Sequence, residues 1–234
     1  MAGAITLEIC VDSVASAVKA QEGGAHRVEL CASLDIGGIT PSPGMVEIVR
    51  RHISIGLHVM IRPRGGDFCY SEPELEVMAR DIASAKRNGA NGVVFGVLDP
   101  NIKVDVPRNK ILLDCARPLS VTFHRAFDNV PDPLEALEVL IRMGFDRVLT
   151  SGQGRSALEG LPLITLLVQK ARGRISVMPG AGIQESNIKT ILGQSGAKEI
   201  HVSRGVKTSA SENPAPGTVD PAKVLRLLEL TESS

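Results

Sequence analysis

Short apolar segments alternate with longer amphipathic segments from one end of the chain to the other. The short segments have the composition of buried strands, and the amphipathic segments repeat apolar residues at helical spacing. The predicted strands are Thr6–Cys10, Arg27–Cys31, Leu57–Arg62, Gly92–Val97, Ser120–Arg125, Arg147–Ser151, Ile175–Pro179 and Glu199–Ser203. The clearest predicted helices are Glu74–Asn88, Pro133–Met143, Leu161–Arg172, Glu185–Gln194 and Pro221–Leu230.

Eight strands that alternate with helices within 234 residues predict a closed parallel (β/α)8 barrel, formed as one domain over residues 1–234. A doubly wound open sheet is the alternative, but no GxGxxG motif follows the first predicted strand. A glycine that can end a helix precedes every second predicted strand, as expected of a chain built from repeated βαβα units. These glycines are Gly24, Gly89, Gly144 and Gly196.

The alternation of side chains along the strands predicts a polar barrel interior. Successive side chains on a strand point to opposite faces, and the apolar set, such as Leu7 and Ile9, should face the helices. Barrel interiors are usually filled with Val, Ile and Leu, so polar groups in this one must form a satisfied network or meet a ligand. The inward set is Glu8, Cys10, Glu29, Cys31, His58, Met60, Arg62, Ser120, Thr122, His124, Ser176, Met178, Glu199, His201 and Ser203.

Two cysteines of the inward set, Cys10 and Cys31, end the first two predicted strands. Neighbouring strands lie ~4.8 Å apart, so both sulfurs can reach one ion. Two thiolates with the thioether of Met60 or Met178 form a soft donor set that suits Cu(I), and a histidine is the alternative to Met60 for completing the shell. The alternative is that each cysteine is a small apolar core residue.

Two other strand ends carry groups suited to an anion. Arg62 and Arg64 stand beside a Gly-Gly turn and can offer guanidinium forks together with free backbone N–H groups. In the alternative, Asp67 pairs with one of the two arginines and holds the loop. The turn from Gly180 to Gly182 follows the seventh predicted strand, where barrels often bind phosphate, although a tight turn also needs glycine for its backbone.

The same strand ends also fit an enzyme that acts on a small anionic or phosphorylated substrate. In this second hypothesis His124 would move protons, while Glu8 and Glu29 would position the reacting group. Arg62, Arg64 and the glycine turn would hold the anion.

Composition and charge limit the partners and the compartment. The 26 basic residues balance 26 acidic ones without a basic run, so we expect no nucleic acid partner. No apolar run approaches the ~20 residues of a membrane-spanning helix, so we expect no membrane partner either. The segment from Met1 to Glu8 lacks the regions of a signal peptide, and the four cysteines form no CxxC pair. We therefore expect free thiols in a cytoplasmic protein.

Several sequence strings resemble the CutC copper-homeostasis family. The longest are IRPRGGDF at residues 61–68 and VTFHRAFD at residues 121–128, and the similarity runs from Leu7 to about Ser203. The resemblance implies a (β/α)8 barrel, generally cytoplasmic in bacteria and often a homo-oligomer. It also implies a link to copper tolerance, with Cu(I) bound by cysteines that match Cys10 and Cys31.

The sequence departs from the family pattern after Ser203. Family members usually continue with a small residue and a longer segment containing a Met-x-aromatic-Arg-Asn string. Here Arg204 follows, and then the short stretch Gly205–Val219, rich in Ser, Pro, Thr and Gly, which we expect to be mobile.

Because they share inward parity and a strand-end position, six residues should line one cavity at the carboxyl ends of the strands. They are Glu8, Cys10, Glu29, Cys31, Arg62 and His124.

Overall fold

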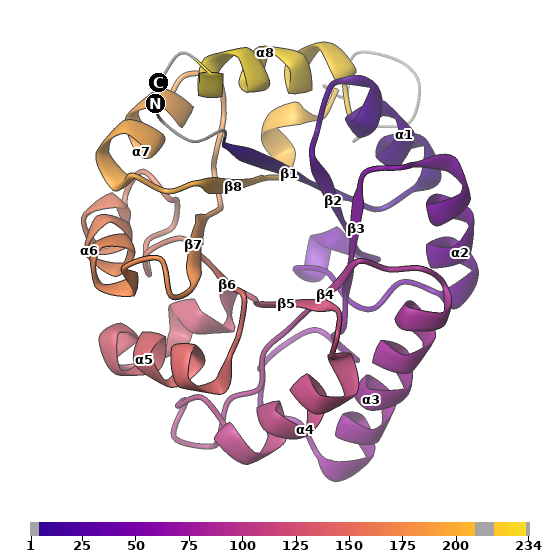
Figure 1. Ribbon diagram of the computed structural model, residues 1–234, viewed down its shortest axis with the longest axis vertical. Helices are drawn as coiled ribbons and strands as arrows, with labels where there is room; N and C mark the ends of the chain where they lie inside the picture. The colour runs from indigo at the N-terminus through magenta and orange to yellow at the C-terminus, as the bar shows by residue number, and fades with distance from the viewer. Residues whose placement is uncertain (1–4, 209–217, 233–234) are drawn as a thin grey trace.

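The computed structural model describes residues 5–208 and 218–232, which form a (β/α)8 barrel (Figure 1). The strands are β1 (Thr6–Val11), β2 (Arg27–Leu30), β3 (Gly56–Met60), β4 (Gly92–Phe95), β5 (Ser120–Phe123), β6 (Arg147–Thr150), β7 (Ser176–Pro179) and β8 (Glu199–Val202). The helices that surround them are α1 (Val14–Glu22), α2 (Pro43–His52), α3 (Glu72–Arg87), α4 (Val106–Ala116), α5 (Pro133–Met143), α6 (Leu161–Ala171), α7 (Ile188–Ser195) and α8 (Pro221–Glu232). The predicted fold class is confirmed.

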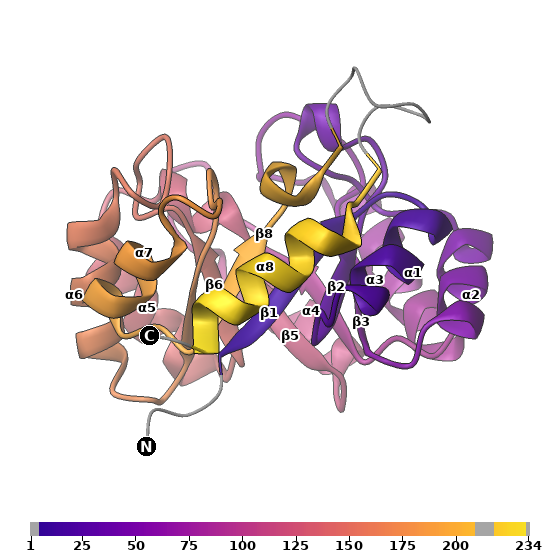
Figure 2. The ribbon, with the colours of Figure 1, turned by 90° about the horizontal axis from the view of Figure 1, so that it is seen from above.

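Neighbouring strands form parallel ladders in the order β7-β6-β5-β4-β3-β2-β1-β8. The strands β7 and β8 contact each other without a ladder between their described residues, and this contact completes the ring in Figure 1. In the side view of Figure 2, α8 crosses the outside of the barrel over β1 and β8. Among the described helices, none is long and apolar enough to cross a bilayer.

The predicted alternation of faces is confirmed. The apolar set of each strand lies fully buried between the strands and the helices, as Leu7, Ile9, Val28 and Leu30 show. Burying such a side chain stabilises the fold by ~1.5–3 kcal/mol, so this layer holds the strands in register. A smaller, separate apolar cluster lies inside the barrel and is formed by Cys10, Cys31, Met60 and Val94.

An ion network fills the barrel interior below this small cluster. The Arg27 guanidinium donates to Glu8 and, over 2.6 Å, to Glu199, which also accepts from Arg147 over 3.0 Å. Burial alone would raise the pKa of Glu8, but Arg27 and the hydrogen bond from His201 outweigh it and hold that pKa well below its usual value. The carboxylates are therefore charged and paired, as buried charges must be.

Two differences from the expected pattern go beyond shifts of one or two residues at the ends of an element. Helix α7 begins at Ile188 rather than Glu185, because the Asn187 side chain accepts from the Gln184 N–H (3.0 Å) and donates to the Gly182 carbonyl (2.8 Å), closing a turn first. The stretch Gly205–Val219, expected to be mobile, is ordered at both ends, where Lys207 pairs with Val219. The remainder of this prediction, over 209–217, lies outside the described residues.

We predict that Gly92→Ala destabilises the fold by ~1–3 kcal/mol, since a Cβ there would meet the buried His58 ring at 2.5 Å. Urea unfolding followed by circular dichroism measures the change. Gly44→Ala is the matched control, because its Cβ meets nothing within 4 Å and it lies in α2, where alanine should stabilise by roughly 0.5 kcal/mol. Equal stability of the two variants would contradict a filled barrel interior.

Candidate functional site

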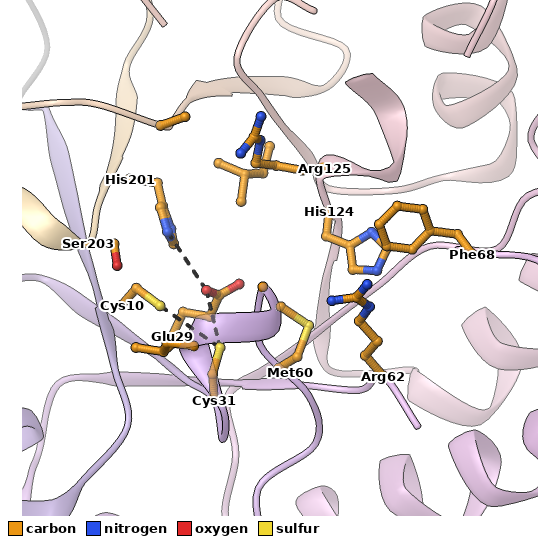
Figure 3. A pocket seen from close by; sticks show the side chains of 14 residues that line it. Cys10, Glu29, Cys31, Met60, Arg62, Phe68, His124, Arg125, His201 and Ser203 are labelled. Atoms are coloured by element: carbon orange, nitrogen blue, oxygen red, sulfur yellow. Dashed lines mark hydrogen bonds and ion pairs between the residues drawn. The ribbon is translucent and has the colours of Figure 1, made fainter. Parts of the chain in front are cut away.

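A cavity of about 180 Å³ opens at the carboxyl ends of the strands (Figure 3). Five of the six residues that we expected to line one cavity do so: Cys10, Glu29, Cys31, Arg62 and His124. Glu8 does not, because Arg27 and His201 hold its carboxylate one layer deeper in the barrel. The prediction for Glu8 is therefore wrong in depth, although its inward direction is right.

The two cysteines meet on one side of this cavity. Their Sγ atoms lie 3.9 Å apart, and the Cys31 Sγ lies 3.5 Å from Oε2 of Glu29. Both thiols are almost completely buried, at 4% and 1% exposure, and Met60 packs against them. The three donor atoms of Cys10, Glu29 and Cys31 all lie within 4.8 Å of one another, which is a spacing that a metal ion can bridge.

The loop after β2 closes over the sulfurs. Gly38 has a φ of +85°, and a Cβ there would stand 3.2 Å from the Cys31 Sγ, so this position requires glycine for both backbone and space. A backbone bridge between Ala32 and Ile39 fixes the ends of the loop. The β2 loop is thereby held against the thiol pair.

His201 lies on the cysteine side of the cavity, although the sequence placed it only in the inward set and not among the predicted site residues. Its Nδ1 lies 2.7 Å from Glu8 Oε1, and its Nε2 lies 3.8 Å from Glu29 Oε2. The signal that could have found it was its inward parity on the last strand, next to the first. Its place between two carboxylates depends on the pairing of β1 with β8, where Glu8 stands opposite His201.

The buried groups of this side shift one another's pKa. Burial raises the pKa of Glu29 well above its usual value, and the nearby Cys10 adds to the shift. The hydrogen bond with Cys31 lowers the pKa of Cys10 well below that of a free thiol, and His201 assists. Burial alone would lower the pKa of His201, but Glu29, Cys10 and Glu8 raise it well above 6.5. The arrangement therefore favours a Cys10 thiolate beside a His201 imidazolium.

Arg62 lies on the other side of the cavity and is 5% exposed. Its Nη1 donates to the carbonyls of Ile36 and Gly38, each over 3.1 Å, and its Nη2 donates to Gly66 over 2.7 Å. Its Cζ lies 4.8 Å from the centre of the Phe68 ring. Among the described residues no carboxylate pairs with this guanidinium, and its buried Nε has no hydrogen-bond partner.

His124 stands beside Arg62 and is 3% exposed. Burial, with help from Arg62, lowers the pKa of His124 to about 3, so the ring is neutral at pH 7. Its Nδ1 accepts from the Ala126 N–H over 3.3 Å, which assigns the single ring proton to Nε2. Nε2 has no partner in the described residues, so it is a buried, unused donor.

Arg64, Gly180 and Gly182 have other surroundings. Arg64 pairs with Glu74 (2.6 Å) and Asp67 (3.0 Å) outside the cavity, which is the loop clamp that the sequence left as the alternative. Gly180 fits against Leu149 in the wall, and Gly182 faces Ser156. Residues 183–187 separate the glycine turn from the start of α7, and of the turn only Ala181 lines the cavity.

The sequence model of the CutC family matches residues 5–206. The chain belongs to the CutC family. A relative named copper homeostasis protein cutC homolog, from Homo sapiens, is 55% identical over 202 residues, covering 86% of this chain and 74% of the human protein. A family protein CutC from Xanthomonas campestris is 49% identical over 215 residues, which cover 92% of this chain and 90% of the Xanthomonas protein. The crystal structure of a CutC protein from Streptococcus agalactiae superimposes on this CutC-family chain with a TM-score of 0.81 at 33% identity, covering 84% and 97%.

We predict that His124 makes the fold less stable in acid. The unfolded chain binds a proton at this histidine below ~6.5, whereas the folded protein does not until about pH 3, so stability falls as the pH falls through this window. Between about pH 7.5 and about pH 5, proton binding to this histidine in the unfolded chain lowers the free energy of unfolding by roughly 2 kcal/mol. His124→Asn keeps an acceptor near the Nδ1 position and cannot titrate, so it should lose that much less stability in urea unfolding at the two pH values. Identical losses in wild type and variant would show that the ring titrates normally.

Proposed function

We propose that this CutC-family chain binds one Cu(I) ion at the barrel mouth through the thiolates of Cys10 and Cys31. The copper is the cargo of a homeostasis protein, which agrees with the name of the human relative. The observation that carries the proposal is the convergence of the two sulfurs, 3.9 Å apart inside a cavity that opens to solvent.

The sulfur separation fits a three-coordinate ion. With a metal–thiolate distance of ~2.3 Å, a separation of 3.9 Å gives a sulfur–metal–sulfur angle of about 115°, close to trigonal. Met60 packs against both thiols and supplies a soft third donor, while Glu29 lies within 3.5 Å of Cys31 and supplies a hard one. A donor set that is mainly sulfur selects Cu(I).

The protein's own residues prepare the thiols. His201 stabilises the Cys10 thiolate, and Glu8 holds His201 in place through the 2.7 Å bond to Nδ1. Cys31 keeps its proton until a metal binds, because the hydrogen bond with Cys10, burial and the nearby Glu29 raise the pKa of this thiol well above its usual value. Metal binding then releases that proton, as it does at thiol sites in general.

The family resemblance implies a cytoplasmic protein that forms a homo-oligomer, and we propose both for this chain. A reduced thiol pair requires a reducing compartment, so we propose a cytoplasmic location. A homo-oligomer is proposed from the resemblance alone, and sedimentation analysis of the purified protein tests it.

The enzyme hypothesis has less support in the site. Of the residues assigned to it, Glu8 and Arg64 are engaged outside the cavity, and Gly180 and Gly182 do not line it. Glu29, Arg62 and His124 remain at its wall. The thiol pair of the copper hypothesis, by contrast, is intact.

We predict about one equivalent of Cu(I) bound under anaerobic reducing conditions, measured in competition with a chromogenic chelator. Cys10→Ser and Cys31→Ser should each weaken binding by at least about tenfold, since either loss removes one of two thiolates. Cys69→Ser and Cys115→Ser are the matched controls, because neither residue lines the cavity. Zn(II), which prefers four closed ligands, should bind weakly. Equal affinity in all four variants would remove the thiol pair from the proposal.

A further inference from the structure

Opposite the sulfurs, the cavity wall carries the positive charge of Arg62, and no carboxylate of the described residues lies within ion-pair distance of it. Arg62 is 5% exposed, and its Nη atoms donate three hydrogen bonds to neutral carbonyl oxygens. Its neighbour Arg125 also lines the cavity, but Asp128 neutralises it over 2.8 Å. Buried charges are normally paired, so the unpaired guanidinium is a feature that the fold alone does not require.

Two donors at this wall have no acceptor. The Nε–H of Arg62 and the Nε2–H of His124 are both buried and unpartnered among the described residues. An unsatisfied buried donor is costly, and these two belong to neighbouring residues of the same wall. Both groups donate and neither accepts, so the missing partner is an acceptor.

The Phe68 ring packs against both of the side chains that carry these donors. Its ring centre lies 4.8 Å from the Arg62 Cζ and 4.8 Å from the His124 ring, on the opposite side of the cavity from the sulfurs in Figure 3. The Phe68 side chain is only partly buried, and it belongs to the loop after β3. A ligand that displaces this ring gains access to both donors.

We propose that this wall, formed by Arg62, His124 and Phe68 and here called the arginine wall, binds the oxyanion group of a small molecule. A carboxylate or a phosphate meets the requirement, because each accepts charge-assisted hydrogen bonds from a guanidinium edge and a further N–H. The volume of about 180 Å³ limits the ligand to a small molecule. The site is distinct from the thiol pair, and its proposal does not depend on copper.

The test uses the copper-free full chain, titrated with inorganic phosphate in one arm and with acetate in the other. The readout is the ¹⁵N–¹H resonance of the Arg62 Nε–H, assigned by its loss in Arg62→Lys, together with the melting temperature. Bound anion should shift this resonance in a saturable way and raise the melting temperature, as any ligand of the folded state does. The arm with the tighter saturation identifies the class of oxyanion.

Variants separate the arginine wall from general charge effects. Arg62→Lys keeps the charge but lacks the Nε–H edge, so it should weaken anion binding by at least about tenfold. Arg64→Lys is the matched control on the same loop, paired outside the cavity, and should bind as wild type does. Phe68→Ala uncovers the donors and should bind at least as tightly as wild type.

The proposal is overturned by flat titrations with both anions in wild type and in Phe68→Ala, since the donors are then uncovered and still unused. It is equally overturned if Arg62→Lys folds and keeps the wild-type response, or if Arg64→Lys loses it. Should Arg62→Lys fail to fold, the melting temperatures of wild type, Phe68→Ala and Arg64→Lys still decide the question, because each should rise in a saturable way with the anion.

Discussion

The pairing of Arg27 with Glu8 and Glu199 is the interaction on which the interior of this barrel depends. A barrel usually fills its centre with aliphatic side chains, and here the centre holds carboxylates and imidazoles instead. Arg27 joins β1 to β8 by pairing with Glu8 and Glu199. Glu8 in turn pairs with His201 and so fixes the position of its ring. The orientation of His201, and with it the environment of the thiols, follows from this deeper layer, as supporting shells orient ligands at metal sites in general.

The charged groups of the deeper network and of the thiol side are matched in sign, and Arg62 on the opposite wall lies outside this set. With the Cys10 thiolate, Glu8 and Glu199 carry negative charge, while Arg27, Arg147 and the His201 imidazolium carry positive charge, three of each sign. Burial raises the pKa of Glu29 well above its usual value and lowers the pKa of His58 to about 3.

The cavity has two chemically different sides that come from different parts of the chain. Cys10, Glu29, Cys31 and His201 belong to β1, β2 and β8 or follow them directly, and they form the sulfur and carboxylate side. Arg62, Phe68 and His124 follow β3 and β5 and form the arginine wall. Met60, at the end of β3, lies between the two sides in Figure 3. The fold therefore offers separate contacts for a soft cation and for an oxyanion within one opening.

The sequence by itself determined which face each strand residue occupies. The two-residue period assigned Cys10, Cys31, Arg62 and His124 to the interior and the aliphatic residues to the helix layer, because a strand's side chains alternate regardless of its neighbours. Depth and partnership were decided only by the tertiary structure. Parallel pairing places Cys10 opposite Glu29 and Glu8 opposite His201. Because of this register between neighbouring strands, Glu29 lies level with Cys10 at the cavity, whereas Glu8 lies beneath it. The pairing of Asp67 with Arg64 rather than Arg62 was likewise visible only in the tertiary structure, which places Arg64 2.6 Å from Glu74 and 3.0 Å from Asp67.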